Sequence, residues 1–212
     1  MEEAFWHRKW ARNEIGFHEA ETNPLLLRHF PALRLAPGAR VFVPLCGKTR
    51  DIPWLRARGC EIVGSELSRL AVEQLFAEVG VTPRVAEAGL LRCYAADGIR
   101  IFAGNIFDLD RDMLGPVDAI YDRAALVALP DPMRARYAAH LMAMTGTAKQ
   151  LLVCLEYDQS RMAGPPFSVD EAEIRRHYDA AYRIACLESG AIEGGLKGVS
   201  PAREAAWLLE PR

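Results

Sequence analysis

A buried strand that runs into a glycine turn, with an acid at the end of the next strand, most constrains how this chain can fold. Residues 40–43 (Arg-Val-Phe-Val) lead into the turn 44–48 (Pro-Leu-Cys-Gly-Lys), and the second strand, residues 61–66, ends at Glu66. In a doubly wound α/β sheet, such a turn and acid lie at the carboxyl ends of neighbouring parallel strands, where they bind a nucleoside. We therefore expect Glu66 to accept hydrogen bonds from the ribose of an adenosine-containing cofactor.

Strand and helix patterns alternate along the rest of the chain, which predicts one α/β domain over residues 1–212. An Asp97-Gly98 pair between alternating residues predicts a two-residue hairpin, and Ser168 with Glu171 predicts a capped helix start. Two late strand patterns, residues 183–187 and 204–209, have no helical pattern between them. They predict an antiparallel hairpin at the sheet edge, which distinguishes the methyltransferase form of the Rossmann-like sheet from the dehydrogenase form.

The composition excludes several classes of function. The chain has 212 residues, 50% hydrophobic and 25% charged, with a formal net charge of -2, so no basic surface for nucleic acid or an anionic membrane is expected. Five cysteines without a CxxC pair, no secretory signal and no long apolar run predict a cytoplasmic protein with reduced thiols. The histidines show no metal-ligand spacing, so we expect no metal site.

The glycine turn is compatible with three ligands to different degrees. Gly47-Lys48-Thr49 resembles the end of a phosphate-binding loop, but Phe42 occupies the position of its first glycine and Pro44 lacks a backbone donor. A dinucleotide site requires several glycines, and the turn has only Gly47. S-adenosylmethionine carries no phosphate, so the missing glycines favour this methyl donor. The alternative to all three ligands is that the turn and Glu66 have a structural role only and bind no ligand.

Several ordered motifs together resemble the thiopurine S-methyltransferase family. They are residues 43–48 (Val-Pro-Leu-Cys-Gly-Lys), 63–68 (Val-Gly-Ser-Glu-Leu-Ser), 121–129 (Tyr-Asp-Arg-Ala-Ala-Leu-Val-Ala-Leu), 164–167 (Gly-Pro-Pro-Phe) and the aromatic amino-terminal segments 5–10 and 15–18. The resemblance extends from about residue 5 to the final strand, and residues 189–202 are the stretch that it does not place. It implies a class I methyltransferase with a mostly parallel seven-stranded sheet.

The resemblance also implies a set of site residues. The cofactor contacts would be Trp10, Leu45, Glu66, Ile106 and Arg123. Phe17 and Phe167 would form the apolar wall for the acceptor, and residues 1–30 would form a helical lid. Arg123 directly follows a buried strand, so its guanidinium could stabilise a thiolate or the cofactor carboxylate, and an ion pair with Asp122 or Asp108 is the structural alternative. The two tryptophans of the lid, Trp6 and Trp10, could instead belong to an ordinary amphipathic helix.

The expected function is S-adenosylmethionine-dependent methylation of small aromatic or heterocyclic thiols such as thiopurines, by a monomer. Arg123 would be its catalytic residue. Two alternatives use the same strand, turn and acid. One is an NAD(P)-dependent oxidoreductase, and the other is a protein that binds S-adenosylmethionine without catalysis.

Overall fold

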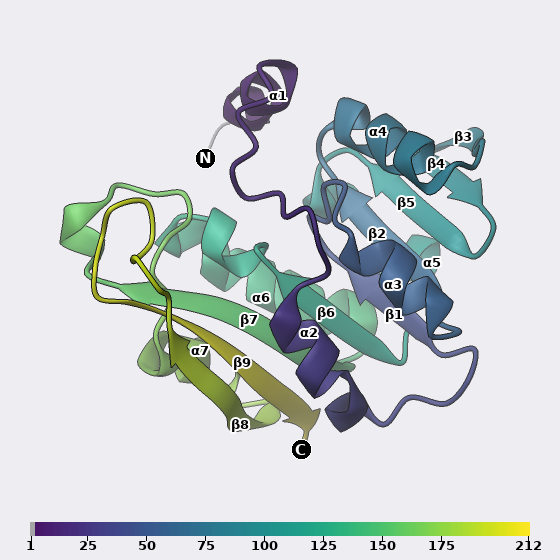
Figure 1. Ribbon diagram of the computed structural model, residues 1–212. Helices are drawn as coiled ribbons and strands as arrows, with labels where there is room; N and C mark the ends of the chain where they lie inside the picture. The colour runs from purple at the N-terminus through teal and green to yellow at the C-terminus, as the bar shows by residue number, and fades with distance from the viewer. Residues whose placement is uncertain (1–2) are drawn as a thin grey trace.

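Across residues 3–212, which the computed structural model describes, nine strands form one mixed sheet. The strand order is β3-β4-β5-β2-β1-β6-β7-β9-β8 (Figure 1). The strands are β1 Arg40–Val43, β2 Glu61–Glu66, β3 Arg84–Ala88, β4 Leu91–Ala96, β5 Ile99–Ala103, β6 Ala119–Arg123, β7 Lys149–Tyr157, β8 Tyr182–Ala191 and β9 Ala202–Pro211.

The sheet has a parallel centre and antiparallel strands at both edges. The parallel pairs join β5, β2, β1, β6 and β7, and β9 pairs antiparallel with both β7 and β8. The doubly wound sheet with an antiparallel carboxyl-terminal hairpin is therefore confirmed. Because the carboxyl ends of β1, β2 and β6 meet at one edge, the turns that follow these strands are brought together there.

The sheet has nine strands where seven were predicted. The order β5-β2-β1-β6-β7-β9-β8 corresponds to the expected seven, and β4 and β3 extend the edge beyond β5. The Asp97-Gly98 turn joins β4 to β5 as predicted, with Ala96 opposite Ile99. Strand β3 lacks a buried side chain, so its sequence carries no alternating apolar pattern that would reveal it.

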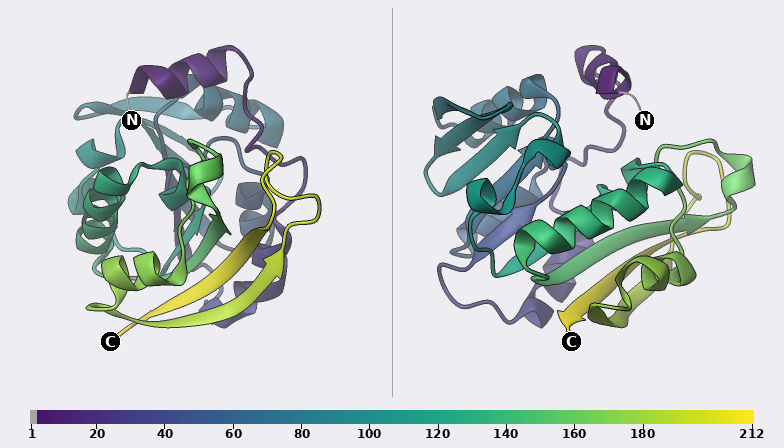
Figure 2. Two further views of the ribbon diagram at one scale, coloured as in Figure 1. Left: turned by 90° about the vertical axis from the view of Figure 1, so that its left-hand side faces the viewer. Right: turned by 180° about the vertical axis from the view of Figure 1, so that it is seen from behind.

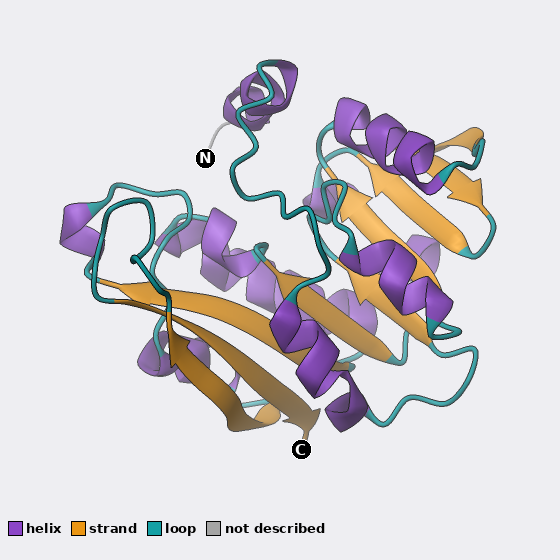
Figure 3. Cartoon of the chain, in the orientation of Figure 1, coloured by secondary structure: helices purple, strands orange, loops and turns teal. Residues whose placement is uncertain are grey.

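Two helical layers cover the sheet, and Figures 1 and 2 show them from opposite sides. Helices α2, α3 and α4 pack on one face, whereas α5, α6 and α7 pack on the other, and each layer encloses its own apolar core (Figure 3). Helix α1 stands above the sheet, outside both layers, and contacts α4 (Figure 1). The helices are α1 Glu3–Ala11, α2 Pro24–His29, α3 Asp51–Ala57, α4 Arg69–Val79, α5 Arg111–Leu114, α6 Asp131–Thr145 and α7 Glu171–Tyr178, with short 3-10 turns at Phe30–Leu33, Ile106–Asp108, Leu126–Ala128 and Gln159–Arg161.

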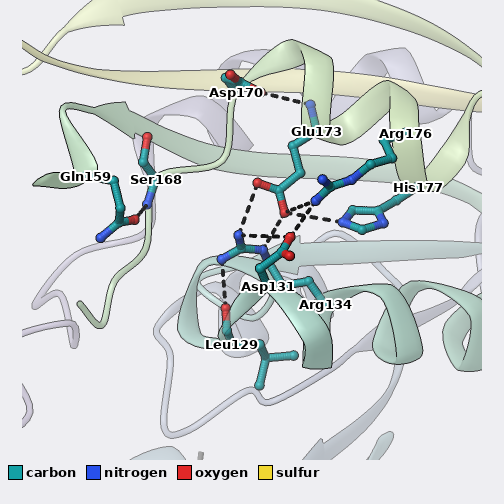
Figure 4. Close-up of polar contacts among 9 residues, drawn as sticks. All are labelled: Leu129, Asp131, Arg134, Gln159, Ser168, Asp170, Glu173, Arg176 and His177. Atoms are coloured by element: carbon teal, nitrogen blue, oxygen red, sulfur yellow. Dashed lines mark hydrogen bonds and ion pairs between the residues drawn. The ribbon is translucent and has the colours of Figure 1, made fainter. Parts of the chain in front are cut away.

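Helix α7 begins at a different cap from the one predicted. The carboxylate of Asp170 accepts the backbone N–H of Glu173, at 2.8 Å (Figure 4). Ser168 instead belongs to the extended segment before the helix, where its hydroxyl accepts the N–H of Tyr157. The prediction of Ser168 as cap was wrong because two capping residues lie close together, and packing of this segment against β7 decides which one begins the helix.

In the part of the chain that the structure describes, no helix combines the length and the apolar composition that a bilayer crossing needs. The five cysteines are free thiols, and Cys46, Cys60 and Cys154 are buried.

Candidate active site

The turn after β1 is held against the end of β2 by its own backbone. Cys46 N–H donates to the Ser65 carbonyl at 2.9 Å, and Gly47 N–H donates to Glu66 Oε2 at 2.8 Å. Leu45 and Gly47 both have left-handed backbone conformations, with φ of 47° and 53°. Glycine adopts such a conformation easily, whereas Leu45 does so only because the surrounding bonds hold it.

Glu66 is buried at the end of β2, and each of its oxygens accepts one backbone N–H. Oε1 accepts from Ser68 at 2.8 Å and Oε2 accepts from Gly47. Burial raises the pKa of Glu66, and these N–H donors oppose that shift. A carboxylate has about four acceptor positions, so lone pairs are left for the two hydroxyls of a ribose.

This turn offers little to a phosphate. The N–H groups of Cys46 and Gly47 are already used within the protein, and the acceptor of the second is a carboxylate. A phosphate needs free backbone donors and repels a neighbouring carboxylate. The residues present therefore fit a nucleoside without phosphate groups, such as the adenosine of S-adenosylmethionine, better than a dinucleotide.

Helix α1 and the segment after it form the roof of the site. Trp10 is 4% exposed, and its ring lies so close to Gly47 that a Cβ there would be 3.1 Å from it. Phe17 packs edge-on against both Trp6 and Trp10, with ring centroids 5.7 Å and 5.6 Å away. The side chain of Asn105, in the loop after β5, donates to the Glu3 carboxylate at 2.7 Å. Aromatic packing and polar contacts thus attach α1 to the sheet edge.

Arg123 lies at the carboxyl end of β6 and points toward this roof. Its guanidinium forms an ion pair with Glu19 and donates to the Phe17 carbonyl at 3.4 Å. The ion pair is therefore neither of the two alternatives predicted, Asp122 or Asp108. Asp122 faces the opposite side of the sheet, as alternate strand residues do, and accepts the hydroxyl of Tyr137 at 2.7 Å.

These elements enclose a cavity of about 510 Å³, within the range of small-molecule sites. Of the predicted site residues, Trp10, Phe17, Leu45, Glu66 and Arg123 line it. His18, which follows Phe17 in the predicted aromatic segment 15–18, lines the cavity too. Sequence reasoning assigned no individual site role to several other lining residues: Lys9, Glu14, Glu19, Leu155, Ile192, Leu196, Lys197 and Glu204.

Two predicted residues lie outside this lining. Ile106 is buried in the core beside α6, where its carbonyl contacts His140 Nε2 at 2.9 Å. Phe167 packs near Arg134, whose guanidinium carbon is 5.7 Å from the ring centroid. The lining on that side comes from residues 164–166 instead. The Phe167 ring instead lies against Gly164 of the Gly-Pro-Pro corner, and this packing could not be deduced from the sequence.

Residues 189–202, which the sequence motifs did not place, complete the far wall. Val199 and Ala202 are buried against Tyr157, with Ile192 and Leu196 packed around them. The same loop is attached to the proline corner by Lys197, whose ammonium donates to the Pro165 carbonyl at 3.1 Å. A signal was present in the apolar residues Ile192 and Leu196, but only the folded chain shows that they line a cavity.

The fold agrees with that of solved methyltransferases of low sequence identity. A Burkholderia thailandensis 1,6-didemethyltoxoflavin-N1-methyltransferase has a TM-score of 0.67 at 14% identity, covering 99% of this chain and 87% of that one. The magnesium protoporphyrin IX methyltransferase of Synechocystis has a TM-score of 0.63 at 14% identity, covering 99% and 100%. The chain therefore has the class I methyltransferase fold, with its cavity at the carboxyl ends of the strands.

The family follows from the sequence comparisons. The thiopurine S-methyltransferase family model matches residues 1–210. A thiopurine S-methyltransferase of Xanthobacter autotrophicus is 58% identical over 211 residues, covering 99% of both chains, and one of Gluconobacter oxydans is 56% identical over 207 residues, covering 98% of this chain and 94% of that one. The chain belongs to the thiopurine S-methyltransferase family.

Proposed function

We propose that this protein transfers the methyl group of S-adenosylmethionine to the sulfur of small aromatic or heterocyclic thiols such as thiopurines. The observation that carries this proposal is the family match over nearly the whole chain, at more than half identity to relatives with that name. The cavity supports it, because a nucleoside-binding carboxylate and an arginine line the same space as the aromatic roof.

The cofactor supplies a methyl group on a positively charged sulfur. We propose that Glu66 accepts the ribose hydroxyls and that Leu45 and Trp10 bound the space beside it. Ile106 stays a prediction for the adenine side, where its backbone or a small movement of its loop would have to provide the contact. Aromatic rings also attract a sulfonium cation, so the position of Trp10 above the turn suits the charged end of the cofactor.

The acceptor would lie between Phe17 and the proline corner, with Phe167 supporting that corner from behind. A thiolate placed in line with the methyl group needs alignment more than covalent assistance. Arg123 is suited to stabilise that thiolate, because its guanidinium lines the cavity and its side chain is only 13% exposed. Glu19 would then hold Arg123 in position between reaction cycles.

The decisive experiment combines ligand titration with a methyl-transfer assay on a thiopurine. We expect the protein to bind S-adenosylhomocysteine in calorimetry, to ignore reduced nicotinamide dinucleotide, and to release S-adenosylhomocysteine with the methylated thiopurine. Binding of the nicotinamide dinucleotide alone would favour the oxidoreductase alternative. Tight binding of S-adenosylmethionine without transfer to any thiol would favour the non-catalytic one.

Replacing Arg123 tests its catalytic part in that function. Arg123→Ala should lower kcat by about 10²-fold, since one electrostatic stabiliser of developing charge is worth roughly that much. Arg203→Ala is the matched control, because Arg203 is exposed and bonds Ser189 rather than the cavity. Equal turnover by Arg123→Ala and the parent would remove Arg123 from the mechanism.

We also propose that the protein acts as a monomer in the cytoplasm. Its five free thiols suit a reducing compartment. A single sedimentation species with the mass of one chain, 23.6 kDa, is the expected result, and a dimer would contradict it.

A further inference from the structure

Glu204 is a partly buried acid that faces the proposed acceptor space. In the pairing of β7 with β9, Glu204 lies directly opposite Leu155, and directly opposed residues share one face of the sheet. Val153 and Leu155 line the cavity on that face, and Glu204 lines it with them. The part of β9 that follows Glu204, from Ala205 to Leu209, is apolar and buried. An acid at this position is therefore fixed by the sheet at the wall of the cavity.

The charges around Glu204 come from three elements. Arg123 of β6 and Arg28 of α2 lower its pKa, and so does the Asn23 side chain, whereas Glu19 raises it. Burial is the largest influence, and the net pKa of Glu204 is raised. Within residues 3–212, Arg123 forms its ion pair with Glu19, and Glu204 forms no ion pair. Glu204 is thus a carboxylate beside the arginine that is not occupied by a salt bridge.

The arginine and the paired acids of this wall are less suited to accept a proton, so the imidazole of His18, which also lines the cavity, is the competing base. Arginine stays protonated in proteins, so Arg123 can stabilise a thiolate but cannot deprotonate a thiol. Glu19 is held by Arg123, and Glu14 is held by Lys9 at 2.7 Å. A thiol with the pKa of an ordinary alkyl thiol, about 8.5, is mostly protonated at neutral pH. Such an acceptor needs a base, whereas an ionised aromatic thiolate does not.

We propose that Glu204 is the general base of this site and that the acceptor class therefore includes small thiols that are protonated at neutral pH. This inference rests on the proposed function. The thiol proton passes to a Glu204 carboxylate oxygen, and the acceptor sulfur forms a bond to the methyl carbon. The bond from that carbon to the sulfonium breaks, its electron pair stays on the departing S-adenosylhomocysteine, and Glu204 then loses the proton to solvent.

The test compares two acceptors that differ in thiol acidity. 4-Nitrothiophenol is ionised at neutral pH, and benzyl mercaptan is protonated. Glu204→Gln should lower kcat/KM for benzyl mercaptan by about 10²-fold and leave kcat/KM for 4-nitrothiophenol within about twofold, because a general base matters only where a proton must leave. Glu210→Gln, the same change near the end of β9 and outside the cavity lining, should leave both values unchanged.

Two further measurements separate catalysis from structure. Glu204→Gln should bind S-adenosylhomocysteine as the parent does, and Glu204→Asp should regain part of the lost activity with benzyl mercaptan. In the parent protein, kcat/KM for benzyl mercaptan should fall as the pH drops through the raised pKa of Glu204, and the profile for 4-nitrothiophenol should lack this limb. With Glu204 as base, the profile for benzyl mercaptan levels off above that pKa, whereas ionisation of the thiol alone would keep it rising up to the pKa of the thiol itself. This difference decides the question even where the variants fold poorly.

Each opposing outcome has a definite meaning. Equal losses with both acceptors would assign Glu204 a structural role, and no loss with either would exclude it as base. A parent protein that methylates 4-nitrothiophenol but not benzyl mercaptan would also overturn the proposal. A loss confined to benzyl mercaptan in His18→Gln but not in Glu204→Gln would assign the role of base to His18. The proposed function itself would be refuted if the parent protein bound S-adenosylhomocysteine but methylated neither of these acceptors and no thiopurine.

Discussion

At the scale of single residues, Glu66 has two roles, one in holding the fold and a proposed one in binding the ligand. Its two oxygens hold the N–H groups of Gly47 and Ser68, so the same carboxylate that fixes the turn presents its remaining lone pairs to the cavity. Only a side chain with two acceptor oxygens can do both at this position. An amide of the same shape has one acceptor oxygen only, and its NH₂ group would meet one of the two backbone donors.

Glu66→Gln is therefore expected to weaken both stability and binding. One buried N–H loses its acceptor, which should lower the free energy of unfolding by about 1–3 kcal/mol. The affinity for S-adenosylhomocysteine should fall by about tenfold, the equivalent of one hydrogen bond to a charged group. Chemical denaturation and calorimetry measure these effects. Glu61→Gln, at the exposed start of the same strand, is the control, and matching behaviour of the two variants would contradict the assignment.

At the scale of elements, α1 and α7 show two ways in which helices are held in this fold. Helix α1 is held at the cavity by the contact of Trp10 with the glycine turn. Helix α7 is held to α6 by an ion-pair network in which Arg134 contacts Glu173 and Arg176 contacts Asp131, with His177 beside Glu173 (Figure 4). Asp131, Glu173 and His177 converge closely enough for a cation, but the two guanidinium groups already neutralise the acids.

The contact of α1 with the turn can be measured by adding one methyl group. Gly47→Ala places a Cβ against Trp10 and also strains a left-handed residue, while Gly38→Ala adds similar backbone strain with nothing within 4 Å. Both variants should lose about 1 kcal/mol of stability. Only Gly47→Ala should weaken binding of S-adenosylhomocysteine and change tryptophan fluorescence. If Gly38→Ala weakened binding equally, the Trp10 contact would have no role at the site.

The network between α6 and α7 should contribute to stability because its central pair is largely buried. The side chains of Arg134 and Glu173 are 7% and 13% exposed. Glu173→Gln leaves the Arg134 guanidinium with only the exposed Asp131, at 3.6 Å, as a charged partner and should lower the free energy of unfolding by about 3 kcal/mol. Glu171→Gln removes an exposed i,i+4 pair with Arg175 on the same helix and should change it by less than about 0.5 kcal/mol. Similar values for both variants, by urea denaturation, would show that the network adds nothing.

At the scale of the whole molecule, the sheet separates two apolar cores, and β6 contributes to both of them and to the cavity. Its residues Tyr121, Asp122 and Arg123 point in alternation to the two sides. Tyr121 donates to Asp51 on one side at 3.0 Å, and Asp122 accepts from Tyr137 on the other. One strand thus carries polar contacts to both helical layers and ends in the proposed catalytic arginine.

Asp122 should make the stability of the whole domain depend on pH. Burial raises its pKa from the ordinary 3.8 to about 6, so the folded state favours the protonated form. The stability gained from this is present below about pH 4 and is lost as the pH rises through about 6. The asparagine of Asp122→Asn cannot titrate. Between about pH 4 and about pH 6, the free energy of unfolding of this variant should therefore fall by on the order of 2 kcal/mol less than that of the parent protein.

Tyr137→Phe provides the opposing comparison for Asp122. The Tyr137 hydroxyl stabilises the ionised carboxylate, so its loss should raise the pKa of Asp122 further and make the decline with pH steeper. Thermal or denaturant unfolding at several pH values measures both variants. A decline in Asp122→Asn parallel to that of the parent would show that another group is responsible.

The sequence alone determined the features that depend on neighbouring residues. The buried strand 40–43 and the Asp97-Gly98 hairpin follow from local hydrogen bonding and periodicity, and the structure contains both. The position of Glu66 follows as well, because parallel strands with a short turn bring their carboxyl ends together. Strand β3 did not follow, since a strand without a buried face lacks the alternating pattern.

The tertiary structure decided the features that depend on residues far apart along the chain. Arg123 pairs with Glu19, Phe167 packs near Arg134 outside the cavity lining, and Glu204 and the loop 192–199 form the far wall of the cavity. None of these contacts leaves a local pattern, because each depends on how separate layers pack and which side chains then meet. The sequence therefore determined the class of sheet and its nucleoside acid, and the packing of distant segments determined the shape and charge of the acceptor space.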